Sequence, residues 1–308
     1  MNKGSSVRHE SVGVVLLNWN GAGLTIACIE SLLRGDLVPD RIVVVDNASS
    51  DGSAELIEAR FNQVRMIRNP KNLGFAAGNN VAIDELIKQD VDYIWVLNND
   101  TEVAPACLAE LVAAMGQDPE ATGCCGKILY DSPRDQIWYA GATINRLLVQ
   151  SRHRGALETD CGQYDTLETT PFITGCCMFV RKSAWQSVGG FDDSFFAYSE
   201  DLDWSLRARK KGMKLLYVPA AVIFHKISVS FRKTGNANGG YTTPLMIKLG
   251  HRNRLFIIRK HADSVLQKIA CLLTFSCWSL YYSCGLLLLG RYGKLKSLWA
   301  GISEGMQS

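Results

Sequence analysis

Acidic residues are absent from a long part of this chain. Between Ser205 and Lys260 there is no Asp or Glu, although thirteen Lys and Arg residues fall in the same interval. The formal net charge of the 308 residues is only +3, so the imbalance is local. It predicts a surface for a polyanionic partner such as phosphates, anionic lipid or nucleic acid. A solvated basic face is the ordinary alternative, and charge alone leaves both open.

Cysteine pairs with zinc-site spacing are also missing. None of the ten cysteines forms a CxxC pair, and Cys124, Cys125, Cys176 and Cys177 lie inside apolar runs. We therefore expect small core side chains with reduced thiols. The opening MNKGSSVRHES contains no apolar signal region, which favours the cytoplasm.

Charge is missing again near the end of the chain. Residues 269–290 form an uncharged run of 22 residues, about 33 Å long as a helix and close to the thickness of a bilayer core. Lys and Arg flank both ends, so the positive-inside rule assigns no orientation. Three interpretations remain open: a membrane span, a helix lying in the membrane interface, and a packing or dimer helix.

What the first half does contain is an alternation of strand and helix patterns. The buried-strand runs are VGVVLLNW (12–19), RIVVVD (41–46), VRMIRN (64–69) and DYIWVLNND (92–100), with apolar helical spacing between them. This order predicts a mostly parallel sheet covered by helices, with ligands beyond the carboxyl ends of the strands. The polar residues expected to gather there are Asn18, Trp19, Asn20, Asp46, Asn47, Asn98, Asn99 and Asp100.

The second half is less regular. Residues 124–130 and 171–185 are predicted as strands, with an irregular stretch over 131–170 between them. A turn followed by a helix is expected over 189–212, and a strand broken by Pro219 over 215–226.

Two aspartates at strand ends are candidates for metal chemistry. Asp46 and Asp100 each follow a buried strand without a basic neighbour in sequence. Such carboxylates suit Mg²⁺ or Mn²⁺ bridging a diphosphate, although Asp also commonly caps a following helix. His225 follows another strand and is either a structural residue or a ligand in company with Asp100.

Two further segments offer chemistry. YSEDLDW (198–204) places Glu200, Asp201 and Asp203 at a helix start, where Asp203 can pair with Arg207 and Glu200 or Asp201 can act as a general base. A solvated acidic helix start is the alternative. NPKNLGFAAGNN (69–80) combines glycines and asparagines that can touch a ligand, but it matches neither the P-loop nor the GxGxxG pattern.

Taken together and in order, these segments resemble the family 2 inverting glycosyltransferases of the GT-A fold, in particular the bacterial rhamnosyltransferase-like branch. The resemblance covers about Val12 to His261 and is carried by NWN, VVVDNASSDGS, NLGFAAGNN, VLNNDT, TGCCMFVRKSAWQSVGGFDDSFFAYSEDLDWSLRARKKG, VPAAVIFHK and GHRNRLFIIRKH. Each motif is modest alone, and the ordered set is specific.

The resemblance implies roles for individual positions. Asp201 is the base for the acceptor hydroxyl, and Asp100 with His225 holds a divalent metal, Mn²⁺ or Mg²⁺. Asn98 stands where the family has the first acidic residue of its DXD motif, which leaves Asp100 as the main acidic ligand. The expected nucleotide-sugar residues are Asn18, Trp19, Asp46, Asn47, Asn72, Gly74, Asn79, Asn80, Asn98, Asn99 and Asp100, and Glu200 and Trp204 are expected on the acceptor side.

The resemblance also implies an organisation and a task. Residues 1–262 would form a GT-A domain, a Rossmann-like, mostly parallel sheet flanked by helices, with a nucleotide-binding half at about 10–125 and an acceptor half at about 126–262. Residues 263–308 would associate with the membrane as a peripheral segment or single anchor, at the cytoplasmic face of the inner membrane. The expected reaction moves a sugar, with rhamnose suggested by the branch, from a nucleoside diphosphate to a glycan or lipid-linked glycan of the cell envelope. An oligomer remains open.

Three rival functions are compatible with parts of the sequence. A nucleotidyltransferase would carry a basic Gly-rich loop after the first strand, which NWNGAG is not. A degenerate, membrane-associated nucleotide-sugar-binding module is the main alternative, because of Asn98. A nucleic-acid binder is disfavoured because no DNA or RNA recognition motif accompanies the basic stretch.

Overall fold

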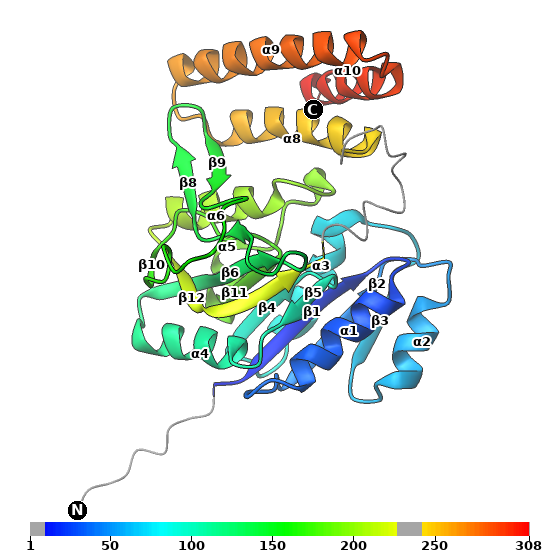
Figure 1. Ribbon diagram of the computed structural model, residues 1–308, viewed down its shortest axis with the longest axis vertical. Helices are drawn as coiled ribbons and strands as arrows, with labels where there is room; N and C mark the ends of the chain where they lie inside the picture. Colours follow the sequence, from blue (N-terminus) through cyan, green and yellow to red (C-terminus); the bar gives the residue numbers. More distant parts are fainter. Residues whose placement is uncertain (1–9, 227–241, 308) are drawn as a thin grey trace, which may run out of the picture.

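The computed structural model of the protein describes residues 10–226 and 242–307 and has a mixed sheet as its centre (Figure 1). The strands are β1 (Val12–Asn18), β2 (Arg41–Asp46), β3 (Arg65–Arg68), β4 (Tyr93–Leu97), β5 (Thr101–Val103), β6 (Ala121–Tyr130), β7 (Ile137–Tyr139), β8 (Ala142–Asn145), β9 (Gln150–His153), β10 (Glu168–Thr169), β11 (Cys177–Arg181) and β12 (Lys214–His225). The helices are α1 (Ala22–Leu33), α2 (Ser53–Arg60), α3 (Gly74–Ile87), α4 (Cys107–Gln117), α5 (Lys182–Val188), α6 (Glu200–Lys210), α8 (Pro244–His261), α9 (Val265–Leu288) and α10 (Tyr292–Gln307).

The first four strands form the expected parallel unit. The sheet runs in the order β10-β12-β6-β11-β4-β1-β2-β3, and β1 is parallel to both β2 and β4. Their residues are almost wholly buried because helices cover them, which explains their continuous apolar sequences. The register places Asn18 opposite Asp46 and Leu16 opposite Leu97, so the polar ends of three strands meet at one edge.

The second half corrects two details of the sequence prediction. β11 lies antiparallel between β4 and β6, and it ends at Arg181, where α5 begins. A strand over the whole of 171–185 was therefore wrong, because only Cys177–Arg181 pair in the sheet and the residues from Lys182 onward form α5. The stretch 131–170 contains the short strands β7 to β10, with β8 and β9 forming a separate hairpin. β12 continues past Pro219 with a register shift between Val218 and Val222, as expected from an interrupted strand.

The last three helices stack as a layer on one end of the molecule (Figure 1, top). α10 crosses α8 so closely that a Cβ on Gly301 would lie 2.1 Å from the Lys248 carbonyl oxygen. The hairpin β8–β9 reaches this layer, where Gln267 Nε2 donates to Arg146 O (2.6 Å) and Arg254 Nη1 donates to Val149 O (2.6 Å). The expected boundary at 262/263 falls in the turn between α8 and α9 and stays a prediction.

Candidate active site

A cleft of about 850 Å³ opens at the carboxyl ends of β1 and β4. Its size is that of a small-molecule site. The lining residues come from the segment after β1, from the segment after β4, and from two distant loops: Leu17, Trp19, Asn20, Gly21, Ala22, Gly23, Leu24, Asp51, Phe75, Leu97, Asn98, Asn99, Asp100 and Tyr198. Four residues predicted to bind the nucleotide sugar therefore line this cleft: Trp19, Asn98, Asn99 and Asp100.

Asn18 and Asp46 form the buried floor behind this cleft. Asn18 Nδ2 donates to Asp46 Oδ1 (2.9 Å), and Ser49 N donates to Asp46 Oδ2 (3.0 Å). Both side chains are almost fully buried, whereas the neighbouring Trp19 is 57% exposed. Asp46 thus fixes the turn after β2 rather than capping a helix, and Trp19 offers an open aromatic face to a ligand.

Asn47, Asn72 and Gly74 are joined by hydrogen bonds next to Asn18 and Asp46. Asn47 Nδ2 donates to Asn72 Oδ1 (2.9 Å) and to Gly74 O (3.1 Å), and Leu73 N donates to Asn47 Oδ1 (3.0 Å). Gly74 has φ +80°, a conformation that favours glycine. In this structure the three residues shape the start of α3, which carries Phe75 into the cleft.

Three other predicted residues point away from the cleft. Asn79 is buried and its Nδ2 donates to Phe75 O within α3 (2.8 Å). Asn80 Nδ2 donates to Phe191 O (2.8 Å) and so joins α3 to the loop before α6. Trp204 is fully buried, with Nε1 donating to Gly189 O (2.9 Å), so it supports α6 from behind and is not open to an acceptor.

Asp100 and His225 meet although 125 residues separate them. β5 pairs with the end of β12, which brings His225 Nε2 to 3.1 Å from Asp100 Oδ1 and 3.5 Å from Asn98 Nδ2. Burial acts to raise the pKa of Asp100, but the imidazole of His225 and the charge of Lys226 outweigh it, so the pKa lies below its ordinary value. Asp100 is followed by β5 and caps no helix. Asn99 turns the other way and donates to Thr25 Oγ1 (2.8 Å).

This pair fits a divalent metal only with help from other ligands. A carboxylate and an imidazole are acceptable to Mn²⁺. Within residues 10–226 and 242–307, however, no group of three or more His, Cys, Asp or Glu side chains is placed to hold an ion. A metal at Asp100 and His225 would thus take its remaining ligands from bound phosphate oxygens, water or the Asn98 amide.

Glu200 and Asp201 begin α6 as two buried neighbouring carboxyl groups. Burial raises the pKa of Glu200 well above its ordinary value, and the adjacent Asp201 adds to the effect. Burial also raises the pKa of Asp201, but N–H donation from Gly175 (3.0 Å) and Leu202 (2.8 Å), with His153 nearby, opposes it. Among the described residues, Glu200 Oε2 has no hydrogen-bond partner. Burial thus raises the pKa of both carboxyl groups, and the N–H donation from Gly175 and Leu202 makes Asp201 the one of the pair that ionises more readily.

Asp201 also lies close to the cleft wall. A Cβ on Gly175 would be 3.6 Å from the Asp201 Cβ and 3.1 Å from the ring of Phe75, which lines the cleft. A backbone hydrogen bond joins the segment that contains Asp100 to the segment that contains Gly175. Asn98 N, two residues before Asp100, donates to Cys176 O (3.1 Å). The candidate base thus lies close to the Phe75 wall of the cleft, and the candidate metal ligand Asp100 lines the cleft itself.

Sequence reasoning missed two aromatic residues between these groups. The Trp138 ring lies edge-on to His225 at 4.9 Å and to His153 at 4.5 Å, centroid to centroid. Both come from the stretch that was predicted to be irregular, where no motif or periodicity marks them. Tyr198 and Phe75, in contrast, adjoin quoted motifs and line the cleft.

Most of the basic stretch does not form an open cationic surface. Arg207 pairs with Asp203 as predicted (2.8 Å), Lys214 pairs with Asp118 (2.5 Å), and Lys248 pairs with Glu304 (2.5 Å). Arg252, Arg254 and Arg259 donate to backbone carbonyls. The acidic partners of Lys214 and Lys248 are distant in sequence, which is why composition suggested a polyanion site. Arg232 and Lys233 lie outside the described residues.

The family comparison and the curated relatives agree with this geometry. Residues 13–189 match the family model "Glycosyl transferase family 2". An N-acetylglucosaminyl-diphospho-decaprenol L-rhamnosyltransferase of Mycobacterium tuberculosis is 28% identical over 211 residues. The match spans 61% of this chain and 66% of that protein.

Solved structures show the same fold. A mannosyltransferase from Pyrobaculum calidifontis, in complex with GDP-Man and Mn²⁺, gives a TM-score of 0.58 at 14% identity and covers 97% of this chain and 88% of its own. GalNAc-T7 with UDP, GalNAc and Mn²⁺ gives 0.61 at 17% identity, covering 83% of this chain and 48% of its own. At these identities the likeness concerns the fold, which is of the GT-A type.

Proposed function

Because the chain belongs to glycosyl transferase family 2, we propose that the cleft binds a nucleoside-diphosphate sugar and transfers its sugar, with inversion, to an acceptor hydroxyl. The observation that carries this proposal is the Asp100–His225 pair at the edge of the cleft, with Asp201 at the start of α6 close to the Phe75 wall of the same cleft.

The proposed reaction is a single displacement. Asp201 accepts the proton of the acceptor hydroxyl, and the oxygen attacks the anomeric carbon from the side opposite the nucleotide. The bond between that carbon and the diphosphate oxygen breaks, and its electron pair leaves with the diphosphate. A divalent metal bound at Asp100 and His225 would supply positive charge for that leaving group.

The donor and the acceptor are proposed from the relatives. The M. tuberculosis relative is named as an L-rhamnosyltransferase acting on a diphospho-decaprenol-linked sugar. We extend this to a deoxysugar such as rhamnose, carried on a nucleoside diphosphate, and to a lipid-linked glycan acceptor in cell-envelope polysaccharide assembly. Trp19 would lie against the base, and Asn18 and Asp46 would hold the turn that presents it.

Calorimetric titration tests the donor site. We expect one member of a panel of dTDP, UDP and GDP to bind in the presence of Mn²⁺ with at least about tenfold higher affinity than the others, because the buried polar groups of the floor select among bases. Titration of the same panel without metal gives the comparison. Failure of a folded sample to bind any of them would instead favour a degenerate module without donor binding.

The apolar face of α9 supports a membrane location. One stripe of this helix is buried and contains Cys271, Phe275, Ser279 and Ser283, while the exposed side carries Leu266, Leu273, Leu280 and Leu287. A helix on the surface of a water-soluble protein would bury its leucines and expose its serines. α9 is also the one helix in the described part of the chain that is long and apolar enough to cross a bilayer.

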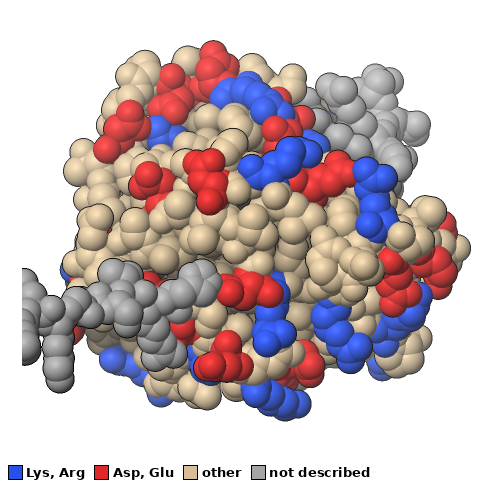
Figure 2. Space-filling view, turned by 90° about the horizontal axis from the view of Figure 1, so that it is seen from below, with Lys and Arg blue, Asp and Glu red and all other residues tan. Residues whose placement is uncertain are grey.

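We propose that α9 lies in the membrane interface rather than across the bilayer. It runs along α8 and α10 as part of a layer, so its length is held against the catalytic domain (Figure 1). Figure 2 shows the opposite end of the molecule, where acidic and basic residues are mixed around an uncharged centre, as suits a surface in water. This orientation would place the cleft within reach of a lipid-linked acceptor at the cytoplasmic face of the membrane.

Vesicle binding tests the orientation. We expect Leu273→Asp with Leu280→Asp to lower the fraction bound to phosphatidylglycerol–phosphatidylethanolamine vesicles by at least about tenfold, because each leucine loses on the order of 1–2 kcal/mol of burial. The control is Leu56→Asp, an equally exposed leucine on α2 (57%), which should leave flotation unchanged. Unchanged flotation of the double variant would place the contact elsewhere.

A further inference from the structure

The loop that leads into α6 has an unfavourable backbone. Phe196, Tyr198 and Ser199 all have positive φ, at 61°, 71° and 72°. Such conformations are unfavourable in a non-glycine residue, so the surrounding structure must hold them.

The side chain of Asn253, on α8, makes the contacts that hold this loop. Its Nδ2 donates to the carbonyls of Phe195 (3.1 Å), Ala197 (2.8 Å) and Tyr198 (2.7 Å), and the residue is fully buried. A single amide group, whose two hydrogens are shared among three carbonyl oxygens, therefore holds the strained backbone. No role was assigned to this residue or to its motif GHRNRLFIIRKH by sequence reasoning.

Arg252 orients Asn253 and adds a second set of contacts. Arg252 Nε donates to Asn253 Oδ1 (3.0 Å), which directs the Asn253 amide nitrogen toward the loop. Arg252 Nη2 donates to Ser194 O (3.0 Å) and Phe195 O (2.7 Å). The loop thus receives all these donors from two adjacent residues of one helix.

The loop connects three parts of the candidate active site. Phe196 O accepts from Phe75 N (2.5 Å) and Ala76 N (3.1 Å) at the start of α3, and so positions the Phe75 wall of the cleft. Tyr198 lines the same cleft. Ser199 is the residue before α6, which begins with Glu200 and Asp201.

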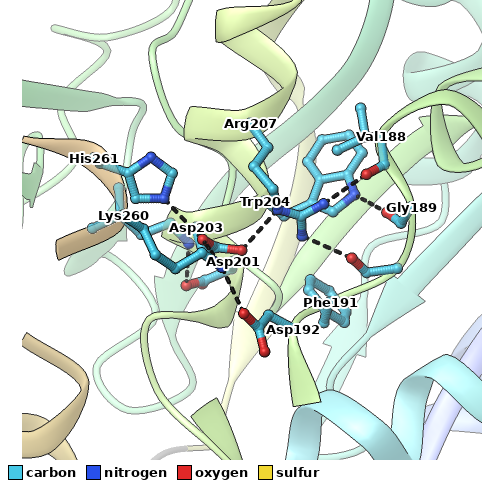
Figure 3. Close-up of polar contacts among 12 residues, drawn as sticks. Val188, Gly189, Phe191, Asp192, Asp201, Asp203, Trp204, Arg207, Lys260 and His261 are labelled. Atoms are coloured by element: carbon cyan, nitrogen blue, oxygen red, sulfur yellow. Dashed lines mark hydrogen bonds and ion pairs between the residues drawn. The ribbon is translucent and has the colours of Figure 1, made fainter. Parts of the chain in front are cut away.

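The far end of α8 holds the same segment from its other side (Figure 3). Asp203 lies within 2.8 Å of His261 Nε2, 2.7 Å of Lys260 Nζ and 2.8 Å of Arg207 Nε, and Lys260 Nζ also reaches Asp192 Oδ2 (2.6 Å). Burial opposes ionisation of Asp203, but these partners lower its pKa to about 2, so it is a carboxylate at neutral pH. Both α6 and the loop before it are therefore fastened to α8.

We propose that Asn253, oriented by Arg252, is a positioning residue that sets the Asp201 end of α6 and the Tyr198 wall of the cleft for transfer. The proposal rests on the proposed function for its chemistry and on the hydrogen bonds for its geometry. The layer of α8, α9 and α10 would then have a second role, because α8 also positions the loop before α6.

Hydrogen exchange and steady-state transfer measure the two parts of the proposal. Asn253→Asp keeps the size of the side chain but removes the amide donor. We expect amide exchange at Phe75, Ala76 and residues 197–203 to rise at least about tenfold, and kcat per nucleotide-binding molecule to fall by about tenfold or more, because small displacements of a catalytic group have effects of this size. Arg252→Gln, a partly exposed position, should change both in the same direction by less, and it keeps the test available if Asn253→Asp does not fold.

The control is Arg259→Gln on the same helix. Arg259 Nη2 donates to Met306 O of α10 (2.8 Å), so its loss weakens α8 contacts without touching the loop. We expect the Arg259→Gln variant to keep the wild-type rates of amide hydrogen exchange at 75–76 and 197–203. We also expect it to keep the wild-type kcat. Unchanged exchange in both Asn253→Asp and Arg252→Gln would overturn the proposal, as would raised exchange with unchanged kcat. If the wild-type protein transfers no sugar, the exchange result still decides whether Asn253 holds the loop, and the proposed function fails separately.

Discussion

The Asp201→Asn variant is expected to bind the donor normally and to lose transfer by about 10²–10⁴-fold, because the amide cannot accept the acceptor proton. The carboxylate already receives N–H donation from Gly175 and Leu202, which an amide oxygen can still accept in part, so the fold should persist. The measurement is kcat with a matched nucleotide sugar and acceptor, together with the nucleotide affinity of the variant. Full activity in Asp201→Asn would remove it from this role.

Glu200→Gln is the matched control for that variant. Burial and the neighbouring Asp201 hold the pKa of Glu200 well above its ordinary value, so a neutral glutamine imitates the state it already has, and we expect less than a tenfold loss. The wild-type rate should fall as the pH drops through the raised pKa of Asp201, because the base must be ionised to act. A large loss in Glu200→Gln with an active Asp201→Asn would exchange the two roles.

The second large effect is expected at Asp100. Asp100→Ala should lose the metal dependence of nucleotide-diphosphate binding, with an affinity in Mn²⁺ lowered by about 10–100-fold toward the value in EDTA, since the main acidic ligand is gone. The backbone contact of Asp100 O with Lys226 N (2.8 Å) does not depend on the side chain, so β5 and β12 should stay paired. Calorimetric titration with and without Mn²⁺ gives both values.

Asp51→Asn provides the comparison for Asp100. Asp51 also lines the cleft, but on the side of the loop after β2, where its Oδ1 accepts from Ser53 N (3.0 Å). We expect this variant to keep the Mn²⁺ dependence of the wild type. A metal response in Asp100→Ala equal to that of the wild type would show that other groups hold the ion.

Much of the site could be predicted because it depends on local patterns. The buried apolar runs of β1, β2 and β4 are readable in the sequence, and parallel strands bring their carboxyl ends to one edge. The structure brings Asn18 against Asp46, and Asp100 to the same edge of the sheet, for that reason. Asp201 was predicted as the base from its motif and stays a prediction; the sequence did not show how its surroundings differ from those of Glu200, because burial and hydrogen bonding depend on the fold around each carboxyl group.

The remainder depended on contacts between distant segments. His153 and Trp138 lack any periodic or motif signal. Trp138 reaches His225 because β7 pairs with β6, and His153 of β9 packs against Trp138. Asn79 and Trp204 belong to quoted motifs, yet helix rotation turns them into the interior. Sequence patterns report which face of an element is apolar, and they do not report which polar residue of a motif meets a ligand.

The sequence by itself determined the alternation of strands and helices in the first half, the edge where the cleft forms and the family to which the chain belongs, because these follow from apolar periodicity and from ordered motifs. Only the tertiary structure decided three other features. These are the antiparallel position of β11, the ion pairs made by the basic stretch, and the hydrogen bonds of Asn253 to the loop before α6. Each of those depends on long-range pairing, in which a charge or an amide finds its partner only after the chain has folded.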